Sequence, residues 1–409
     1  MRGSAGQSVL IVGGGFAGLQ AALNLPRSLD VTLADQTGEF EFLANIHELV
    51  SQVKSPESLR LPLDKLVRRM GHRFVRGRVV RIDRDLRRAV TGRGESLGYD
   101  ALILAIGGVD ADFGVPGVGE HAIGFKSVNE CHAIGQRLAE LADAGRPFEV
   151  VVIGGGLEGV ETLGEILRKY RNNSNLRVVL VEGSSQLMPG SPSEIDTWIR
   201  RACKDYPVQI VTGIRVGSIG RESVTLETGT SLPSDLTIWT GGIAPPRMLL
   251  DSGLTDSPNE FLETNLTLQS VVDPDIFAAG DVASFVLPVT KQAYHAMDSG
   301  TLAAKNVLRH FAGRKLKAFD PVGKPMLVSF GDLGGFMVLG DKAIQGNLMT
   351  LAKEVIFQTL MAKYDGVGRP SSALRLSNRL ARAGKRIILP TVTSPRSLLG
   401  LPSMNILAW

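Results

Sequence analysis

Short apolar runs, each followed by a glycine-rich stretch and then by a helical pattern, recur along the chain. Residues 9–12 and 150–153 are apolar without a break, and each run leads directly into three consecutive glycines. An unbroken apolar run of this length is typical of a strand buried on both faces, as in a parallel sheet. After each glycine stretch, apolar residues recur at three- and four-residue intervals, as on one face of a helix. The pattern predicts an α/β fold assembled from strand–turn–helix units.

The first of these units carries glycines at the spacing of a dinucleotide-binding turn. Gly13, Gly15 and Gly18 form the pattern G-x-G-x-x-G between the predicted strand and the predicted helix. Gly13 permits the tight turn, Gly15 lets a pyrophosphate approach the backbone, and Gly18 lets the helix pack against the strand. The amino terminus of the helix then offers free N–H groups to the phosphates. A second strand ends at Asp35, whose carboxylate is placed to bind ribose hydroxyls.

The same unit recurs in the middle of the chain. Gly154, Gly156 and Gly159 have the same spacing, and the strand that follows ends at Glu182. One such match is weak evidence, because glycine turns also serve for packing alone. Two complete units in one chain are hard to attribute to chance, and we therefore predict two dinucleotide sites.

Two further elements belong with the first turn. Residues 99–108 read as a buried strand that runs into a glycine turn at Gly107. Residues 273–285 read as a strand that ends at Gly280 and Asp281. With the first turn, they resemble the flavoproteins that have two dinucleotide-binding domains, in which the Gly-Asp element binds the ribityl chain of the flavin. The resemblance implies FAD at the first turn and a nicotinamide nucleotide at the second.

Glu182 also bears on which nicotinamide nucleotide is used. Its carboxylate would face the 2′-phosphate of NADPH, a like-charge contact that costs several kcal/mol. Residues 182–191 contain no arginine or lysine to offset this repulsion. We expect NADH to be preferred over NADPH.

Because the Gly-Asp element belongs with the first turn, the second nucleotide domain must be an insertion. We predict an FAD-binding domain from residues 1–119 and 247–320, and an NAD(P)H-binding domain from residues 120–246. Residues 321–365 read as short strands with glycine turns and then a helix, which predicts a small carboxyl-terminal α+β domain.

The composition is consistent with such an enzyme, since 44% of the 409 residues are hydrophobic and 47 are glycine. Cys131 and Cys203 form no C-x-x-C pair, so a disulfide framework, a thiolate metal site and a redox-active dithiol lack support. Charged and apolar residues alternate in 74–90, as on the solvated face of antiparallel strands, so we expect no nucleic-acid site. No run approaches the ~18 apolar residues of a membrane span, and no targeting segment is recognisable. We expect a cytoplasmic protein.

The last 44 residues, 366–409, differ in charge from the rest of the chain. All seven of their charged side chains are basic, whereas residues 1–365 carry a net charge of −3. Arginines repeat at helical spacing beside a stripe of apolar residues, namely Arg375, Arg379, Arg382 and Arg386 beside Leu376, Leu380, Ala383 and Ile387. A basic amphipathic helix suits an anionic membrane surface, here the inner face of a membrane. Docking on the protein's own body or on a second subunit is the alternative, so both a monomer and a homodimer are open.

The motifs together resemble two groups of flavoproteins. The runs VGGGFAGLQAA, VVIGGGLEGVETLGEI, IWTGGIAP and DIFAAGDVA are similar to those of type II NADH:quinone oxidoreductases, and the likeness extends over about residues 8–365. The run KQAYHA, residues 291–296, is similar to one in the apoptosis-inducing-factor-like flavoproteins, the group that includes the ferroptosis suppressor protein. The resemblance implies non-covalent FAD, an NADH donor and a quinone acceptor, with Gly241 of IWTGGIAP also at a nucleotide site.

Candidate catalytic residues follow from this resemblance. Glu161 is the counterpart of a glutamate near the flavin in both groups. Lys291 begins the helix after the Gly-Asp strand, so we expect it to reach the reactive edge of the flavin and to pair with Glu161. His295, one turn later, is a candidate proton donor to a quinone oxygen, and the alternative is a histidine that packs the helix start. Gln292 is a candidate flavin-binding residue.

Three functions remain open on the sequence. The first is an FAD-dependent NADH:quinone oxidoreductase at a membrane surface. The second is a soluble NADH-dependent reductase that passes electrons to a protein carrier or acts on a specialised metabolite, because Lys291 and Gln292 stand where type II enzymes usually carry an alanine–glutamine pair. The third is an NADH-sensing interaction protein of the apoptosis-inducing-factor type, whose flavin turns over slowly.

Overall fold

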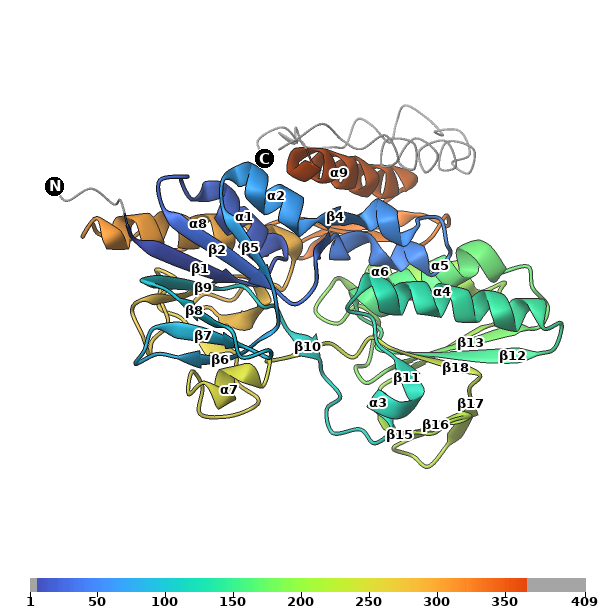
Figure 1. Cartoon of the computed structure of the whole chain (residues 1–409). Helices are drawn as coiled ribbons and strands as arrows, with labels where there is room; N and C mark the ends of the chain where they lie inside the picture. The colour runs from blue at the N-terminus through green and yellow to red at the C-terminus, as the bar shows by residue number, and fades with distance from the viewer. Residues whose placement is uncertain (1–5, 322, 366–409) are drawn as a thin grey trace.

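The first lobe of the molecule is built on a five-stranded parallel sheet with the order β21-β9-β1-β2-β5 (Figure 1). The computed structural model describes residues 6–321 and 323–365. The strands of this sheet are β1 (Ser8–Val12), β2 (Asp30–Asp35), β5 (Arg73–Arg76), β9 (Ala101–Leu104) and β21 (Ile276–Ala278). Because β1 is central, the first glycine turn leaves the sheet between its two halves.

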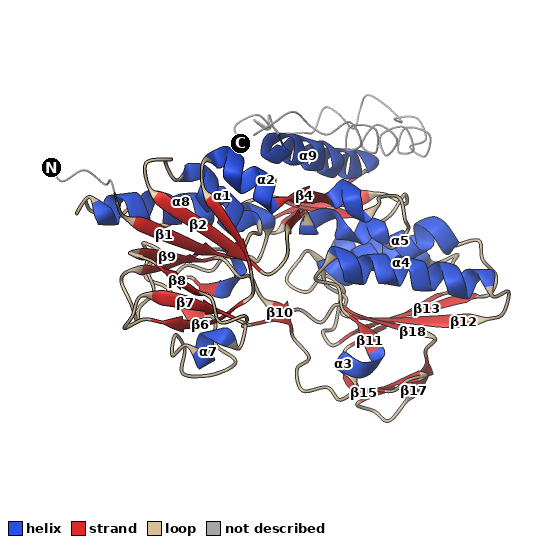
Figure 2. Cartoon of the chain, in the orientation of Figure 1, coloured by secondary structure: helices blue, strands red, loops and turns tan. Residues whose placement is uncertain are grey.

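Side chains of the central strand alternate between two apolar layers. Val9 and Ile11 pack toward helices α1 (Phe16–Asn24) and α8 (Ala293–Phe311), which lie with α2 (Leu63–Met70) over one face of the sheet (Figure 2). Leu10 and Val12 pack toward a three-stranded antiparallel sheet of β6 (Val79–Asp83), β7 (Arg88–Thr91) and β8 (Ser96–Gly98). Burial on both faces explains why the strand is apolar without a break.

The second lobe repeats this plan with the sheet order β11-β18-β12-β13-β14. Its strands are β11 (Ala122–Ile123), β12 (Phe148–Ile153), β13 (Leu176–Glu182), β14 (Val208–Thr212) and β18 (Leu236–Trp239). Helices α4 (Val128–Asp143), α5 (Leu157–Tyr170) and α6 (Ser193–Cys203) lie over one face in Figure 1. The other face packs on the antiparallel strands β15 (Val216–Ile219), β16 (Ser223–Leu226) and β17 (Ser231–Pro233).

A two-stranded antiparallel ribbon joins the lobes. The chain leaves the first lobe through β10 (Val109–Asp110) and returns through β19 (Ile243–Ala244), and these two strands pair with each other. The second lobe is therefore inserted in the first, which confirms the predicted fold class. The domain bounds at 119/120 and 246/247 remain a prediction, and they fall nine residues after the end of β10 and two residues after the end of β19.

Shorter elements complete the lobes. They are β3 (Glu39–Glu41), η1 (Leu43–Leu49), η2 (Pro56–Leu59), β4 (Arg60–Pro62), α3 (Val118–His121), α7 (Met248–Asp251), β20 (Leu262–Glu263), η3 (Gly280–Val282) and β22 (Ala283–Ser284). Of these, η1 and η3 matter for the site, because η1 contacts both α4 and α5 and η3 carries the Gly-Asp element.

The carboxyl-terminal unit consists of an antiparallel sheet and one long helix. The sheet contains β23 (Met326–Ser329), β24 (Gly335–Leu339) and β25 (Lys342–Gln345), and the helix is α9 (Asn347–Asp365), along the top of the molecule in Figure 1. Phe357 of α9 meets the ring of Phe42, with ring centroids 4.9 Å apart, and Tyr364 meets Phe40 at 5.1 Å. These aromatic contacts attach α9 to the first lobe.

Within residues 6–321 and 323–365, no helix is both long and apolar enough to cross a membrane. The predicted amphipathic tail, residues 366–409, lies outside the described residues.

Candidate active site

The first glycine turn has the geometry that its spacing predicts. Gly13 has a φ of +103°, and a Cβ there would lie 2.3 Å from the carbonyl oxygen of Ala105. A Cβ at Gly18 would lie 1.8 Å from the carbonyl oxygen of Gly13. At Gly15, by contrast, a Cβ would meet no atom within 4 Å. The outer glycines are therefore required by the fold, whereas Gly15 leaves open space above the backbone, as a bound pyrophosphate needs.

The second turn has the same division of roles. Gly154 has a φ of +106°, and a Cβ there would lie 2.6 Å from the carbonyl oxygen of Thr240. A Cβ at Gly159 would lie 1.7 Å from the carbonyl oxygen of Gly154, whereas a Cβ at Gly156 would meet nothing within 4 Å. Both turns thus combine a tight base with an open middle position, which is the form of a nucleotide cradle.

A carboxylate is fixed beside each turn. Asp35, at the end of β2, accepts a hydrogen bond from the backbone N–H of Gly14 at 2.7 Å. Glu182, at the end of β13, accepts one from the N–H of Gly155 at 2.6 Å and another from the N–H of Ser184 at 2.6 Å. Such charge-assisted bonds orient the carboxylates at the edge of the sheet where a ribose would lie.

A cation that sequence spacing did not reveal lies close to Glu182. The aliphatic stem of Arg215 runs over Gly183, since a Cβ at Gly183 would lie 3.1 Å from Cγ of Arg215. Arg215 comes from the loop after β14, the strand beside β13, and its side chain is exposed. The stretch 182–191 contains no basic residue, but the fold supplies one from a neighbouring loop.

Other predicted glycines also lie where strands end. Gly107 follows β9 with a φ of +68° and open space around its Cα. Gly241 follows β18, and a Cβ there would lie 2.7 Å from the ring of Trp239. Gly280 has a φ of +75° and lies against Ala17 of α1, since a Cβ added at Gly280 would lie 3.1 Å from the Cβ of Ala17. The ends of β1, β9 and β21 therefore converge at one edge of the first sheet.

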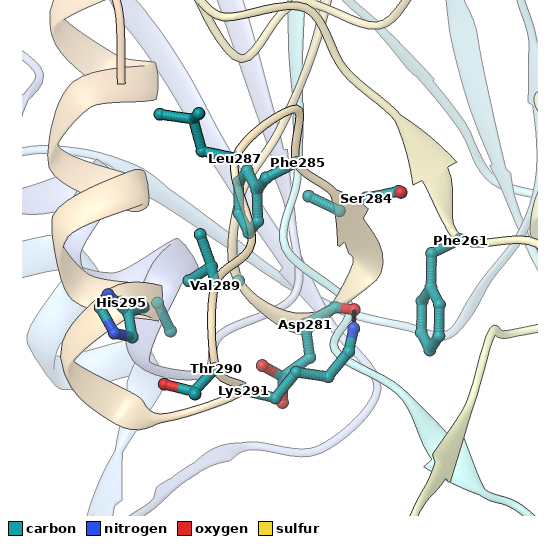
Figure 3. A pocket seen from close by; sticks show the side chains of 12 residues that line it. Phe261, Asp281, Ser284, Phe285, Leu287, Val289, Thr290, Lys291 and His295 are labelled. Atoms are coloured by element: carbon teal, nitrogen blue, oxygen red, sulfur yellow. Dashed lines mark hydrogen bonds between the residues drawn. The ribbon is translucent and has the colours of Figure 1, made fainter. Parts of the chain in front are cut away.

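Next to this edge is a cavity of about 210 Å³, shown in Figure 3. Its lining includes the charged or polar side chains of Asp281, Lys291 and His295. In Figure 3, the ammonium of Lys291 lies beside Phe261, whereas the ring of His295 lies on the other side of Asp281. Apolar side chains, among them Phe285, Leu287 and Val289, also line the cavity. A cavity lined by both polar and apolar side chains suits a flat, weakly polar molecule.

Lys291 lies in this cavity and binds to the Gly-Asp element. Its Nζ donates a hydrogen bond to the backbone carbonyl oxygen of Asp281 at 2.6 Å and lies 3.5 Å from the ring centroid of Phe261 (Figure 3). Burial lowers the pKa of Lys291, and the negative charge of Asp281 opposes this effect. Burial raises the pKa of Asp281, and the positive charges of Lys291 and Lys126 lower it. The lysine therefore holds its proton less tightly than an exposed lysine does.

The other two predicted residues of this helix start have different environments. Gln292 is the residue before α8, and its backbone carbonyl accepts the N–H of Ala296 at 3.1 Å. His295 is 6% exposed, and among the described residues its Nδ1 has no hydrogen-bond partner. Burial lowers the pKa of His295, with Asp298 opposing and Lys324 adding to the shift. His295 is therefore neutral near pH 7 and offers an uncompensated ring nitrogen beside the cavity.

The expected ion pair between Glu161 and Lys291 is not formed. Glu161, 4% exposed, instead forms an ion pair with Lys353 of α9, accepts the N–H of Ser329 at 2.8 Å and lies 3.2 Å from Nδ1 of His47. Burial raises the pKa of Glu161, and Lys353 lowers it. Glu161 on α5 faces η1 and the carboxyl-terminal unit, whereas Lys291 is bound on the first lobe. Glu161 and Lys353 are 192 residues apart in the sequence, so only the folded structure brings them together.

A second ion pair that the sequence did not reveal lies at the second turn. Glu158 occupies a variable position inside G-x-G-x-x-G and pairs with Lys126, in the loop before α4. Burial raises the pKa of Glu158, Lys126 lowers it, and the charge of Asp281 raises it further. Since Lys126 also lowers the pKa of Asp281, its ammonium acts on both the second turn and the Gly-Asp element. The pair lies where the two predicted nucleotide sites face each other.

Carboxylates also gather at the ribbon between the lobes. A Cβ at Gly124 would lie 2.7 Å from a carboxylate oxygen of both Asp110 and Glu130. Burial raises the pKa of Asp110 to about 6, Glu130 and Glu158 contribute to the rise, and Lys126 opposes it. Among the described residues, Oδ1 of Asp110 has no hydrogen-bond partner.

Comparison with known proteins gives consistent results. The model of the family described as pyridine nucleotide-disulphide oxidoreductase matches residues 7–300. A type II NADH:quinone oxidoreductase of Staphylococcus epidermidis is 26% identical over 400 residues, which cover 88% of this chain and 97% of that protein. One of Staphylococcus aureus is 24% identical over 394 residues, with the same shares of each chain.

Solved structures share the fold. NDH2 of Plasmodium falciparum, determined in complex with NADH, has a TM-score of 0.81 at 16% identity, over 93% of this chain and 98% of that one. The sulfide:quinone oxidoreductase of Aquifex aeolicus has a TM-score of 0.78 at 17% identity, over 90% and 93%. At these identities the likeness establishes the arrangement of the lobes and the carboxyl-terminal unit.

Proposed function

Because the chain belongs to the pyridine nucleotide-disulphide oxidoreductase family, we propose that it is an FAD-dependent NADH:quinone oxidoreductase. FAD binds at the first turn through Gly13, Gly15 and Gly18, with Asp35 at its ribose. NADH binds at the second turn, with Glu182 at its ribose. Both turns fit a dinucleotide, because their middle glycines leave the backbone open while a fixed carboxylate stands beside each.

The cavity beside the Gly-Asp element is the observation that carries the choice of acceptor. Its lining combines the polar groups of Lys291 and His295 with the apolar side chains of Phe285, Leu287 and Val289. A quinone has two polar oxygens on an apolar ring, so its surface suits a cavity that offers both kinds of side chain. The loop that carries Leu287 also exposes apolar surface, with Val286 59% and Leu287 41% exposed. An apolar entrance favours an acceptor delivered from lipid over a charged protein carrier.

The protein's own residues manage protons and positions in this reaction. Bound FAD would supply the redox chemistry between NADH and the acceptor. Lys291 holds a proton on Nζ beside the Gly-Asp element, and its lowered pKa makes that proton easier to transfer. Neutral His295 presents an imidazole to a quinone oxygen, where it can donate or relay a proton.

We assign Glu161 to the step in which NADH reduces the flavin. It lies two residues beyond Gly159 on α5, the helix that begins at the second turn. The buried carboxylate is fixed by Lys353 and by the N–H of Ser329, so it acts as a positioning group on the helix that follows the second turn.

We also propose that the enzyme binds peripherally to the inner face of a membrane. The basic residues of 366–409 and the exposed apolar residues Leu351 and Val355 of α9 support this location. The test is binding of the full chain to vesicles with and without anionic lipid. We expect binding that weakens with salt and is lost when 366–409 is deleted. Equal binding of the deleted chain would contradict the role of the tail.

Steady-state oxidation of NADH by the purified, FAD-loaded chain tests the proposed reaction. We expect turnover with a short-chain quinone, and much slower turnover in Lys291→Ala with FAD still bound. Turnover with a protein carrier but none with any quinone would favour the reductase alternative. Negligible turnover with every acceptor would favour the NADH-sensing alternative.

A further inference from the structure

A buried cluster of three charges lies beneath α9, apart from the cavity described above. Nζ of Lys54 lies 3.2 Å from Oε2 of Glu48 and 2.9 Å from Oε2 of Glu354. The side chain of Lys54 is 0% exposed, that of Glu48 1% and that of Glu354 5%. Nζ of Lys54 also lies 4.2 Å from the ring centroid of Phe357. We call Lys54, Glu48 and Glu354 the internal triad.

The internal triad and the Glu161 site use neighbouring residues of the same two segments. In η1, His47 contacts Glu161 while Glu48 contacts Lys54. In α9, Lys353 contacts Glu161 while Glu354 contacts Lys54. The position of Lys353 along and around its helix is therefore tied to the position of Glu354.

Stability alone is a weak reason for such a triad. Removing charges from water costs several kcal/mol per ion, and apolar residues of similar volume often serve a fold as well or better. The best-attested role of a buried polar group is instead to select one packing register. Directional bonds fix a register, whereas apolar contacts such as those of Phe357, Leu360 and Met361 do not.

Register matters here because of helix geometry. A shift of α9 by one residue would rotate its side chains by about 100° and translate them by ~1.5 Å. Lys353 would then leave Glu161. Apolar contacts on α9 would survive a slip in part, since Leu360 and Met361 are both buried neighbours.

We propose that Lys54 is a positioning residue, which fixes the register of α9 through Glu354 and thereby places Lys353 on Glu161. The effect of Lys54 on the reaction rests on the proposed role of Glu161, whereas its effect on α9 does not.

Electrostatics couple the two clusters as well. The negative charge of Glu48 raises the pKa of Glu161, and Lys54 lies between Glu48 and Glu354. Other charged groups face the clusters from α5, where Arg168 lies 3.9 Å from Glu48 and 3.2 Å from Glu165. Loss of Lys54 leaves Glu48 less compensated and favours the protonated form of Glu161.

The test compares Lys54→Met with a neutral triad, Lys54→Met combined with Glu48→Gln and Glu354→Gln. In Lys54→Met, we expect amide hydrogen exchange in 347–365 to accelerate at least tenfold and NADH-driven flavin reduction to slow about tenfold. The neutral triad no longer buries two carboxylates that have lost Lys54, so it regains thermal stability, but its flavin reduction stays slow because the ionic contacts of the triad that fix the register are absent. Lys169→Met, which removes an exposed lysine of α5, should change neither property.

The Lys353→Met background shows whether Lys54 acts through Lys353. There, Lys54→Met should slow reduction no further. Unchanged exchange of α9 in Lys54→Met, or a neutral triad that reduces flavin as fast as the original chain, would overturn the inference. If Lys353→Met alone leaves reduction unchanged, the proposed role of Glu161 fails, and the exchange of α9 still decides how Lys54 acts.

Discussion

Glu161 is held by groups from three segments, and its partner is Lys353 instead of the expected Lys291. We expect Glu161→Gln to keep FAD but to slow flavin reduction by NADH at least tenfold, because an amide carries no charge to compensate the ammonium of Lys353. Stopped-flow mixing with NADH measures this rate. Glu140→Gln, an exposed carboxylate of α4, is the matched control. A variant with normal reduction and only a higher KM for NADH would limit Glu161 to binding.

Asp110 makes the stability of the ribbon between the lobes depend on pH. Burial raises its pKa in the folded chain to about 6, above the 3.8 of an exposed aspartate, so the folded state binds more protons between these values. Stability from this residue is therefore present at low pH and lost as pH rises through about 6. We expect Asp110→Asn to raise the free energy of unfolding by about 1 kcal/mol at pH 7, after allowance for solvent screening, and by almost nothing near pH 4. Denaturant titrations at both pH values check this, and an equal effect at both would count against it.

Arg215 modifies the nucleotide preference expected from Glu182. The carboxylate disfavours a 2′-phosphate, while the guanidinium nearby is able to bind one. We expect Glu182→Gln to raise the ratio of kcat/KM for NADPH over NADH about tenfold or more. In an Arg215→Ala background, the same substitution should raise the ratio much less. Steady-state kinetics with both nucleotides decide this, and equal gains in the two backgrounds would exclude Arg215.

Among turns and helices, the first glycine turn offers a paired comparison. Gly15→Ala adds a Cβ into open space, so the chain should fold normally but bind FAD at least tenfold more weakly, because the methyl group occupies the pyrophosphate side. Gly13→Ala adds a Cβ 2.3 Å from a backbone oxygen at a φ of +103°, so it should destabilise the fold itself. Thermal melts and FAD titrations separate the two effects. A Gly15→Ala chain that retains full FAD affinity would argue against the first turn as the FAD site.

The extent to which the sequence predicts these elements depends on the range of the interactions involved. The strands β1 and β12 and their turns follow from local patterns, because burial and glycine geometry act within a few residues. Contacts of Lys353, Lys126 and Arg215 follow from no local pattern, since each side chain reaches its partner only after the sheets and the ribbon have formed. Lys291 lies next to the Gly-Asp element, but its expected ion pair with Glu161 is not formed, because motif likeness gives a position on a helix and not the direction of a side chain.

At the scale of the whole molecule, the inserted lobe and α9 each add functional groups to those of the first lobe. The insertion brings the second turn opposite the first, and Lys126 acts on both the second turn and the Gly-Asp element. Helix α9 then adds Lys353 to a site formed by the two lobes. In the proposed function, donor and acceptor would have separate approaches, NADH along the second turn and the acceptor through the cavity at Lys291.

Anaerobic mixing of the FAD-loaded chain, first with NADH and then with a short-chain quinone, tests this division most directly. We expect one equivalent of NADH to bleach the flavin absorbance and one equivalent of quinone to restore it, with quinol formed in equal amount. Flavin that NADH does not bleach, or bleached flavin that quinone fails to reoxidise, would contradict the proposed function.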